Sequence, residues 1–163
     1  MSSRGSAKPP GWSQVITTTE PLDAKRFAHL APTVRSELLK RVRAGSLTVG
    51  DSLQQVFVEM FGAGRTRKEL IRFLLFAAPM ARRIAIDLAN VGDRIAGTHV
   101  SVADLKLWLW WLDTTDPLCS RMIDLHYFAG LSFKETAAAL ALPPHAVIRE
   151  LRFAKAWLMV RLT

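Results

Sequence analysis

The stretch that most constrains the fold lies near the carboxyl end, where two prolines separate two amphipathic patterns. Ser132 and Glu135 have the spacing of a capping box, which predicts a short helix over Phe133–Leu140. Pro143 and Pro144 follow shortly afterwards. A proline in the first helical turn costs nothing, because its missing amide hydrogen would have no intrahelical partner. We therefore expect a second helix from Pro144 to the end of the sequence, joined to the first by a tight turn.

The second predicted helix has two chemically different faces. Its apolar positions recur by four, three and four residues, as in a packing stripe: Val147, Leu151, Ala154 and Leu158. The opposite face is mostly basic and comprises His145, Arg149, Arg152 and Lys155, with Ile148 beside it. Such a pair is typical of a helix-turn-helix, whose second helix can lie in the major groove of DNA. Helical hairpins with a basic outer face also occur without DNA binding, so periodicity alone leaves both interpretations open.

The rest of the chain also reads as helix, with no alternating strand pattern of useful length. Helical spacing runs over 24–44, from an N-cap at Asp51 to Gly62, and from about Thr66 to Ile86, where Pro79 is expected to kink or divide the helix. Further helices are predicted over 104–112 and from Pro117 to about Gly130. The fold class is therefore all-α.

Three tryptophans crowd the segment over 104–112. Trp108, Trp110 and Trp111 in "LKLWLWWL" cannot all point in one direction on a helix. This pattern favours a helix that is buried on most sides over one with an exposed, partner-binding face.

Breaks in the periodicity divide the chain. Residues 1–20 are rich in Ser, Thr, Pro and Gly and are expected to form a flexible arm. Glycines interrupt the pattern over 91–100, which predicts a linker between two small helical domains, 21–90 and 101–163. Residues 21–94 hold 13 basic and 7 acidic side chains and so carry most of the net charge of +8. This balance suits a polyanion such as nucleic acid, although a surface charged for solubility has the same composition.

Composition argues against several other classes. With a single cysteine and four scattered histidines, neither a disulfide framework nor a metal or cofactor site is expected. No nucleophile has a nearby base and no glycine loop could hold a phosphate, so we expect no enzyme activity. His126 is expected to pack within a helix. Charged residues interrupt the longest apolar region, and nothing reads as a signal peptide, which predicts a soluble, cytoplasmic protein.

Two parts of the sequence resemble the sigma factors of bacterial RNA polymerase, of the sigma-70 family and its extracytoplasmic-function (ECF) group. "GLSFKETAAALALPPHAVIRELRFAKAWL" (130–158) is similar to region four. "DSLQQVFVEMF" (51–61) is similar to the region-two helix that docks on the polymerase, and "ARRIAIDLAN" (81–90) to the following helix, which melts and reads the minus-ten element. The resemblance covers about residues 22–163.

The resemblance implies a function in transcription initiation with two kinds of partner. Core RNA polymerase would contact the helix over 51–61 through Asp51, Gln54, Gln55 and Phe57. Opened promoter DNA would pass near Arg82 and Arg83, while Asp87 is expected to form a structural ion pair or hydrogen bond rather than to contact the nucleic acid. The minus-thirty-five element would lie against His145, Ile148, Arg149, Arg152 and Lys155. An anti-sigma factor is a further possible partner.

The length of the predicted linker keeps a second function open. A connector over 91–100 reaches at most about 33–36 Å when extended, whereas two promoter elements two helical turns apart are separated by roughly 70 Å. The alternative is a sigma-like regulator or decoy, which binds an anti-sigma factor or DNA without initiating transcription. Ala141 also stands where a glycine often closes the first helix of the motif, which would cost about 1–2 kcal/mol in a left-handed conformation.

Overall fold

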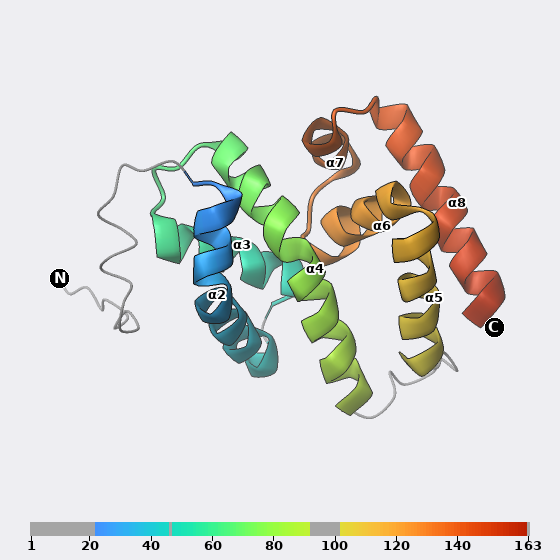
Figure 1. Cartoon of the computed structure of the whole chain (residues 1–163), viewed down its shortest axis with the longest axis horizontal. Coiled ribbons are helices and arrows are strands. Elements are labelled where there is room, and N and C mark those ends of the chain that lie inside the picture. The colour runs from blue at the N-terminus through green and yellow to red at the C-terminus, as the bar shows by residue number, and fades with distance from the viewer. Residues whose placement is uncertain (1–21, 46, 92–101, 163) are drawn as a thin grey trace.

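The computed structural model describes residues 22–45, 47–91 and 102–162, and within these ranges the only regular elements are helices. The all-α prediction is confirmed. The predicted arm over 1–20 and residues 92–100 of the predicted linker lie outside the described ranges. The elements, shown in Figure 1, are α2 (Ala24–Ala44), α3 (Val49–Phe61), α4 (Arg67–Val91), α5 (Val102–Thr115), α6 (Pro117–Ile123), the π-helical turn η1 (Asp124–Phe128), α7 (Phe133–Leu140) and α8 (Pro144–Leu162).

Local capping residues set the ends of the first helices. Asp23 caps α2, where its carboxylate accepts a hydrogen bond from the Arg26 amide at 2.9 Å, and Gly45 ends that helix in the left-handed region. Thr48 caps α3, and its hydroxyl oxygen accepts from the Asp51 amide at 3.1 Å. The predicted N-cap at Asp51 is therefore wrong, because a hydroxyl three residues earlier satisfies that amide. Asp51 lies instead in the first turn, where its negative charge interacts favourably with the positive end of the helix dipole.

Phenylalanine rings hold α2, α3 and α4 together. Phe27 of α2 meets Phe61 and Phe73 edge to face, with ring centroids 6.1 and 5.6 Å apart, and Phe57 lies 5.2 Å from Phe73. Aromatic pairs of this kind contribute about 0.5–1.5 kcal/mol each beyond the area that they bury. Pro79 lies inside the continuous helix α4 and does not divide it. These three helices form the first half of the described molecule, residues 22–91.

The second half, residues 102–162, begins with α5 and α6 and continues through η1. Asp116 caps α6 by accepting from the Cys119 amide at 3.1 Å. The capping box of α7 is confirmed, with Ser132 and Glu135 exchanging two bonds of 3.1 Å between side chain and backbone. The predicted bounds of α7 are confirmed, and α8 begins at Pro144 as expected. No helix in the described ranges is long and apolar enough to span a bilayer.

The turn between α7 and α8 has the geometry of a Schellman motif. Leu142 donates its amide to the carbonyl of Ala137 at 2.9 Å, and Ala141 donates to Ala138 at 3.3 Å. This arrangement places Ala141 at φ 57°, in the left-handed region that favours glycine. The expected conformational cost at this alanine is therefore present. The Pro143 carbonyl then accepts hydrogen bonds from the amides of Ala146 and Val147, so the second helix starts directly after the corner.

The burial of the tryptophan-rich helix differs from the prediction. Leu109 and Leu112 of α5 are buried, but Trp110 is 61% exposed and Leu107 is 54% exposed. Trp111 turns towards α8, where its ring stacks on Trp157 at 5.1 Å. The expectation of a helix buried on most sides is wrong, because neighbouring helices, including α4 and α8, cover one face of α5 and leave the other in solvent.

Residues of both halves are buried in the same apolar cluster. Leu125, Ala129 and Leu131 of the second half are buried in the cluster that contains Leu53 of α3 and Phe73 of α4. In Figure 1, α4 lies between the other helices of the first half and those of the second. The described parts of the two predicted domains are therefore packed directly against each other.

Candidate nucleic-acid interface

Helix α8 presents its basic face outward. Val147, Leu151 and Ala154 are buried, which confirms the predicted packing stripe. The candidate DNA-contacting residues His145, Arg149, Arg152 and Lys155 are exposed, and Ile148 is half-buried beside them. Helix α8 lies at the outer edge of the molecule in Figure 1. A long ligand can therefore approach it without disturbing the fold.

The cations on this face are only weakly engaged within the protein. The Arg149 guanidinium Nε lies 3.8 Å from a carboxylate oxygen of its neighbour Glu150, and the Arg149 side chain is 70% exposed. Exposed pairs of this length contribute little to stability, since water screens both charges. A guanidinium held in this way remains able to bind a phosphate, or to bind the edge of a guanine with two hydrogen bonds.

The same face carries an aromatic residue that the sequence reasoning missed. Phe153 is 69% exposed, and it lies one residue after Arg152 and one helical turn after Arg149. Residues at i, i+3 and i+4 share one side of a helix. The signal in the sequence was this spacing from Arg149, together with the position of Phe153 outside the apolar stripe.

Helix α7 and the residues before it support α8 from inside. Ala137 of α7 is buried against α8, as expected of a small residue at the crossing of two helices. His126 stacks on Phe133 at a centroid distance of 4.3 Å, and its Nδ1 lies 2.8 Å from the carbonyl oxygen of Leu131. The expectation that His126 packs within the fold is confirmed. These contacts hold the start of α7, and through it the corner before α8, in one orientation.

The four α3 residues assigned to polymerase contact lie in different environments. Asp51 and Gln55 are exposed, and Gln55 accepts a hydrogen bond from Arg41 at 3.4 Å. Gln54 is half-buried and donates through Nε2 to the carbonyl of Ala129 at 2.9 Å. Phe57 is buried among the aromatic rings of the core. In this arrangement only Asp51 and Gln55 present their side chains to a partner at the surface.

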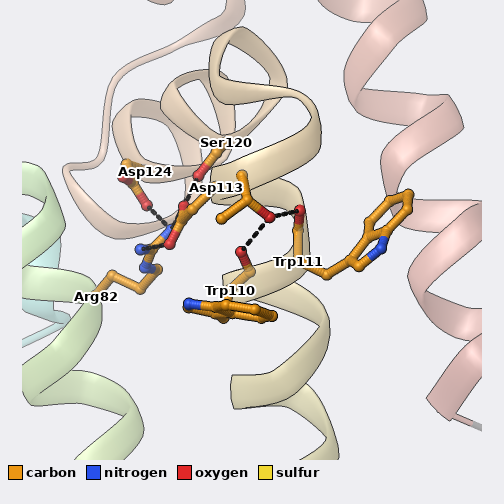
Figure 2. A network of polar contacts seen from close by, with 7 residues as sticks. Arg82, Trp110, Trp111, Asp113, Ser120 and Asp124 are labelled. Carbon is orange, nitrogen blue, oxygen red and sulfur yellow. Dashed lines mark hydrogen bonds and ion pairs between the residues drawn. The ribbon is translucent and has the colours of Figure 1, made fainter.

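Arg82 of α4 occupies a largely buried polar network between the two halves (Figure 2). Its guanidinium donates to both carboxylate oxygens of Asp113, at 3.1 and 2.8 Å, and to the Ser120 hydroxyl at 3.1 Å. It also forms an ion pair with Asp124 at 2.9 Å, while the Ser120 hydroxyl donates to Asp113. Only 15% of the Arg82 side chain is exposed. Here Arg82 binds α5, α6 and η1, and its cation is directed away from solvent.

Asp124 titrates abnormally within this network. Its pKa is raised from an ordinary value of 3.8 to about 6, chiefly because the group is buried and to a smaller extent because of the charge of Asp113, while Arg82 and Arg121 oppose the shift. Loss of hydration therefore outweighs attraction to the guanidinium. The stability of the contact between the halves therefore depends on pH, and the contribution of Asp124 is lost as pH rises through about 6.

The other charged residues of α4 behave more simply. Arg83 is exposed, one position after Arg82. Asp87 pairs with Lys106 of α5 at 2.9 Å, which confirms the expected structural ion pair. Within the described ranges, no group of three or more His, Cys, Asp or Glu side chains is arranged to hold a metal ion.

The structure therefore separates the predicted site residues into three places. The α8 set shares one exposed face, the α3 set lies on a helix of the first half, and Arg82 lies between the halves. Sequence reasoning missed the partners of Arg82, which are Asp113, Ser120 and Asp124. They follow Arg82 by 31 to 42 residues, and nothing in the local pattern pairs them with it.

Comparison with known proteins identifies one family. The sequence model described as "ECF sigma factor" matches residues 81–163, which is about half of the chain and includes the end of α4 and the whole described second half. No curated protein and no solved structure gives a significant match.

Proposed function

The chain belongs to the ECF sigma factor family, whose members act with RNA polymerase in transcription initiation, and we propose that it binds core polymerase and directs it to promoters. In this proposal α8 reads the minus-thirty-five element, and α3 contacts the polymerase. Its residues bind and position polymerase and DNA, and they make or break no covalent bond.

The basic outer face of α8 is the observation that carries the proposal. His145 and Arg149 stand in the first turns of the helix, where residues of a recognition helix reach base edges. Arg152 and Lys155 follow and can contact phosphates, while Ile148 borders the same face. A well-formed contact between an arginine and a guanine discriminates by about 1–3 kcal/mol against other bases. Phe153 adds an apolar surface suited to the methyl group of thymine.

The contact with core polymerase is assigned to the exposed edge of α3. Asp51 and Gln55 lie one helical turn apart and are both accessible. Phe57 supports this edge from within the core, and Gln54 uses one side-chain N–H in its bond to Ala129, so a partner could use that donor only after the bond is released. The proposed polymerase surface is therefore partly engaged in the arrangement observed here.

Single-stranded promoter DNA is assigned to α4. Arg83 is exposed and can attract the phosphates of an opened strand. Arg82 lies beside it but binds Asp113 and Asp124. Under the proposal Arg83 contributes to DNA binding directly, and Arg82 contributes only if the polar network opens.

One experiment tests the function directly. The purified full chain is added to bacterial core RNA polymerase, and binding is measured together with run-off transcription from promoters selected from a genomic fragment library. We expect a stable complex and transcripts that depend on both the chain and the promoter. Absence of binding by the folded chain would contradict the proposal.

The same experiment separates the alternative, in which the chain is a regulator or decoy. The engagement of Gln54 by the second half is the observation that favours this alternative. A decoy would bind DNA or an anti-sigma factor and yield no transcripts with core polymerase on any selected promoter.

A further inference from the structure

We infer that the second half of this protein is a built-in cover for α3, so that the chain rests in a closed state and must open before it engages core polymerase. The inference rests on the proposed function. It concerns the central interface, defined here as Gly50 and Gln54 of α3, Arg82 of α4, Asp113 of α5, Asp124 of η1, and the pair Ala129 and Gly130.

The backbones of two glycines, Gly50 and Gly130, approach each other closely at this interface. A Cβ atom placed on Gly50 would lie 2.8 Å from the amide nitrogen of Gly130 and 2.9 Å from the carbonyl carbon of Ala129. Contacts this short do not occur for real Cβ atoms, and backbone atoms cannot rotate aside. Gly50 sits in the first turn of α3, where glycine is a poor helix former. Its presence is explained by the second half seated directly on the helix.

The same interface engages Gln54, one of the residues assigned to polymerase contact. Gln54 lies one helical turn after Gly50, and its amide nitrogen donates to the Ala129 carbonyl at 2.9 Å. The same side chain also faces Gly130, which adopts φ +80°. While this bond is made, the Gln54 side-chain N–H that it uses is not available to a partner protein. The backbone of residues 129–130 also covers α3 at Gly50.

Several independent contacts hold the second half against the first. Arg82 reaches Asp113, Ser120 and Asp124 on three successive elements of the second half (Figure 2). Arg67 at the start of α4 forms an ion pair with Glu135 of α7. Leu125 and Leu131 are buried in the core of the first half. Opening therefore exposes apolar surface and separates buried charges, so the closed state dominates in the absence of a partner.

The spacing of promoter elements is larger than the closed arrangement allows. Promoter elements two helical turns apart are separated by roughly 70 Å of DNA. In the closed state the two halves that would contact these elements have residues buried in the same apolar cluster. The two halves cannot bind both promoter elements at the same time until they separate. Opening is therefore a required stage of the proposed function.

The experiment introduces a single methyl group at the close approach. Gly50→Ala favours the helix locally but collides with Ala129 and Gly130, so it selectively disfavours the closed state. Gly64→Ala is the matched control, because a Cβ at Gly64 meets nothing within 4 Å. For each full-length variant, the radius of gyration is measured by small-angle X-ray scattering and affinity is measured with bacterial core polymerase.

We expect Gly50→Ala to raise the radius of gyration and, by removing the population cost of opening, to strengthen polymerase binding by about tenfold or more. Gly64→Ala should match the unmodified chain in both measurements. An expanded Gly50→Ala chain with unchanged affinity would overturn the inference, and so would a chain that remains compact. If neither the unmodified chain nor Gly50→Ala binds polymerase, the proposed function itself fails.

A second variant guards against misfolding of Gly50→Ala. Asp113→Ala removes the carboxylate that binds Arg82 with both oxygens, and it leaves α3 untouched. We expect a smaller change in the same direction, with the helical content measured by circular dichroism preserved. Tighter polymerase binding by this variant supports the inference. Unchanged binding by an Asp113→Ala chain that has expanded contradicts it.

Discussion

The central interface and the outer face of α8 use the same residue types under opposite physical conditions. At the central interface Arg82 is largely desolvated and is surrounded by acceptors within 3.1 Å. On α8, Arg149 is mostly in water, and its nearest carboxylate oxygen is 3.8 Å away. A buried ion pair strongly penalises the loss of one partner, whereas an exposed cation contributes little until a ligand arrives. The first arginine therefore serves the fold and the second remains available for binding.

The largest expected effect comes from removing Arg82. The Arg82→Ala change leaves Asp124 buried without its cation, and should lower the free energy of unfolding by about 3–5 kcal/mol at neutral pH. Urea denaturation followed by circular dichroism measures this loss. Arg83→Ala is the matched control and should shift stability by no more than about 0.5 kcal/mol, since its side chain is exposed. Equal losses for the two variants would show that Arg82 contributes no more to the fold than an exposed arginine does.

The next effect is a pH dependence that arises from Asp124. Its folded pKa of about 6 lies above the ordinary 3.8, so the folded state binds an extra proton between these values. The contribution to stability is present below about pH 4 and is lost as pH rises through 6, by about 3 kcal/mol in total. Asp124→Asn should remove this component, so the stability of the unmodified chain relative to the variant should fall across this range. Parallel pH profiles would show that Asp124 titrates normally.

A smaller effect in free energy, confined to binding, is expected on α8. Replacing Arg149 and Arg152 together by alanine should weaken binding to a selected duplex and reduce the dependence of log affinity on log salt by about 1 for each lost phosphate contact. The unfolding free energy should change by no more than about 0.5 kcal/mol. Fluorescence anisotropy at several salt concentrations provides the measurement. An unchanged affinity and salt slope would show that this face does not bind DNA.

The smallest effect concerns Phe153. Replacing thymine by deoxyuracil in the selected duplex deletes only a methyl group, which is worth about 0.8 kcal/mol when buried. We expect the unmodified chain to bind the uracil-containing duplex a few-fold more weakly than the thymine-containing duplex. Phe153→Ala should bind both duplexes equally. If the unmodified chain does not distinguish them, Phe153 contacts no thymine methyl group.

The helices of the motif could be predicted because their signals are local. The capping box of Ser132 and Glu135 lies within one turn, and the prolines define the start of α8. The same local logic failed at Asp51, where Thr48 was an equally suitable cap three residues earlier. It also failed for Trp110, because the exposure of a side chain depends on which other helices reach it.

The sequence by itself determined where most helices lie and which face of α8 is basic, because capping and helical periodicity act over a few residues. It also carried the features that identify the family. Only the tertiary structure decided that Gly50 lies against Gly130 and that Arg82 binds carboxylates from α5 and η1. Such contacts join residues far apart in the chain, so no spacing rule can pair them.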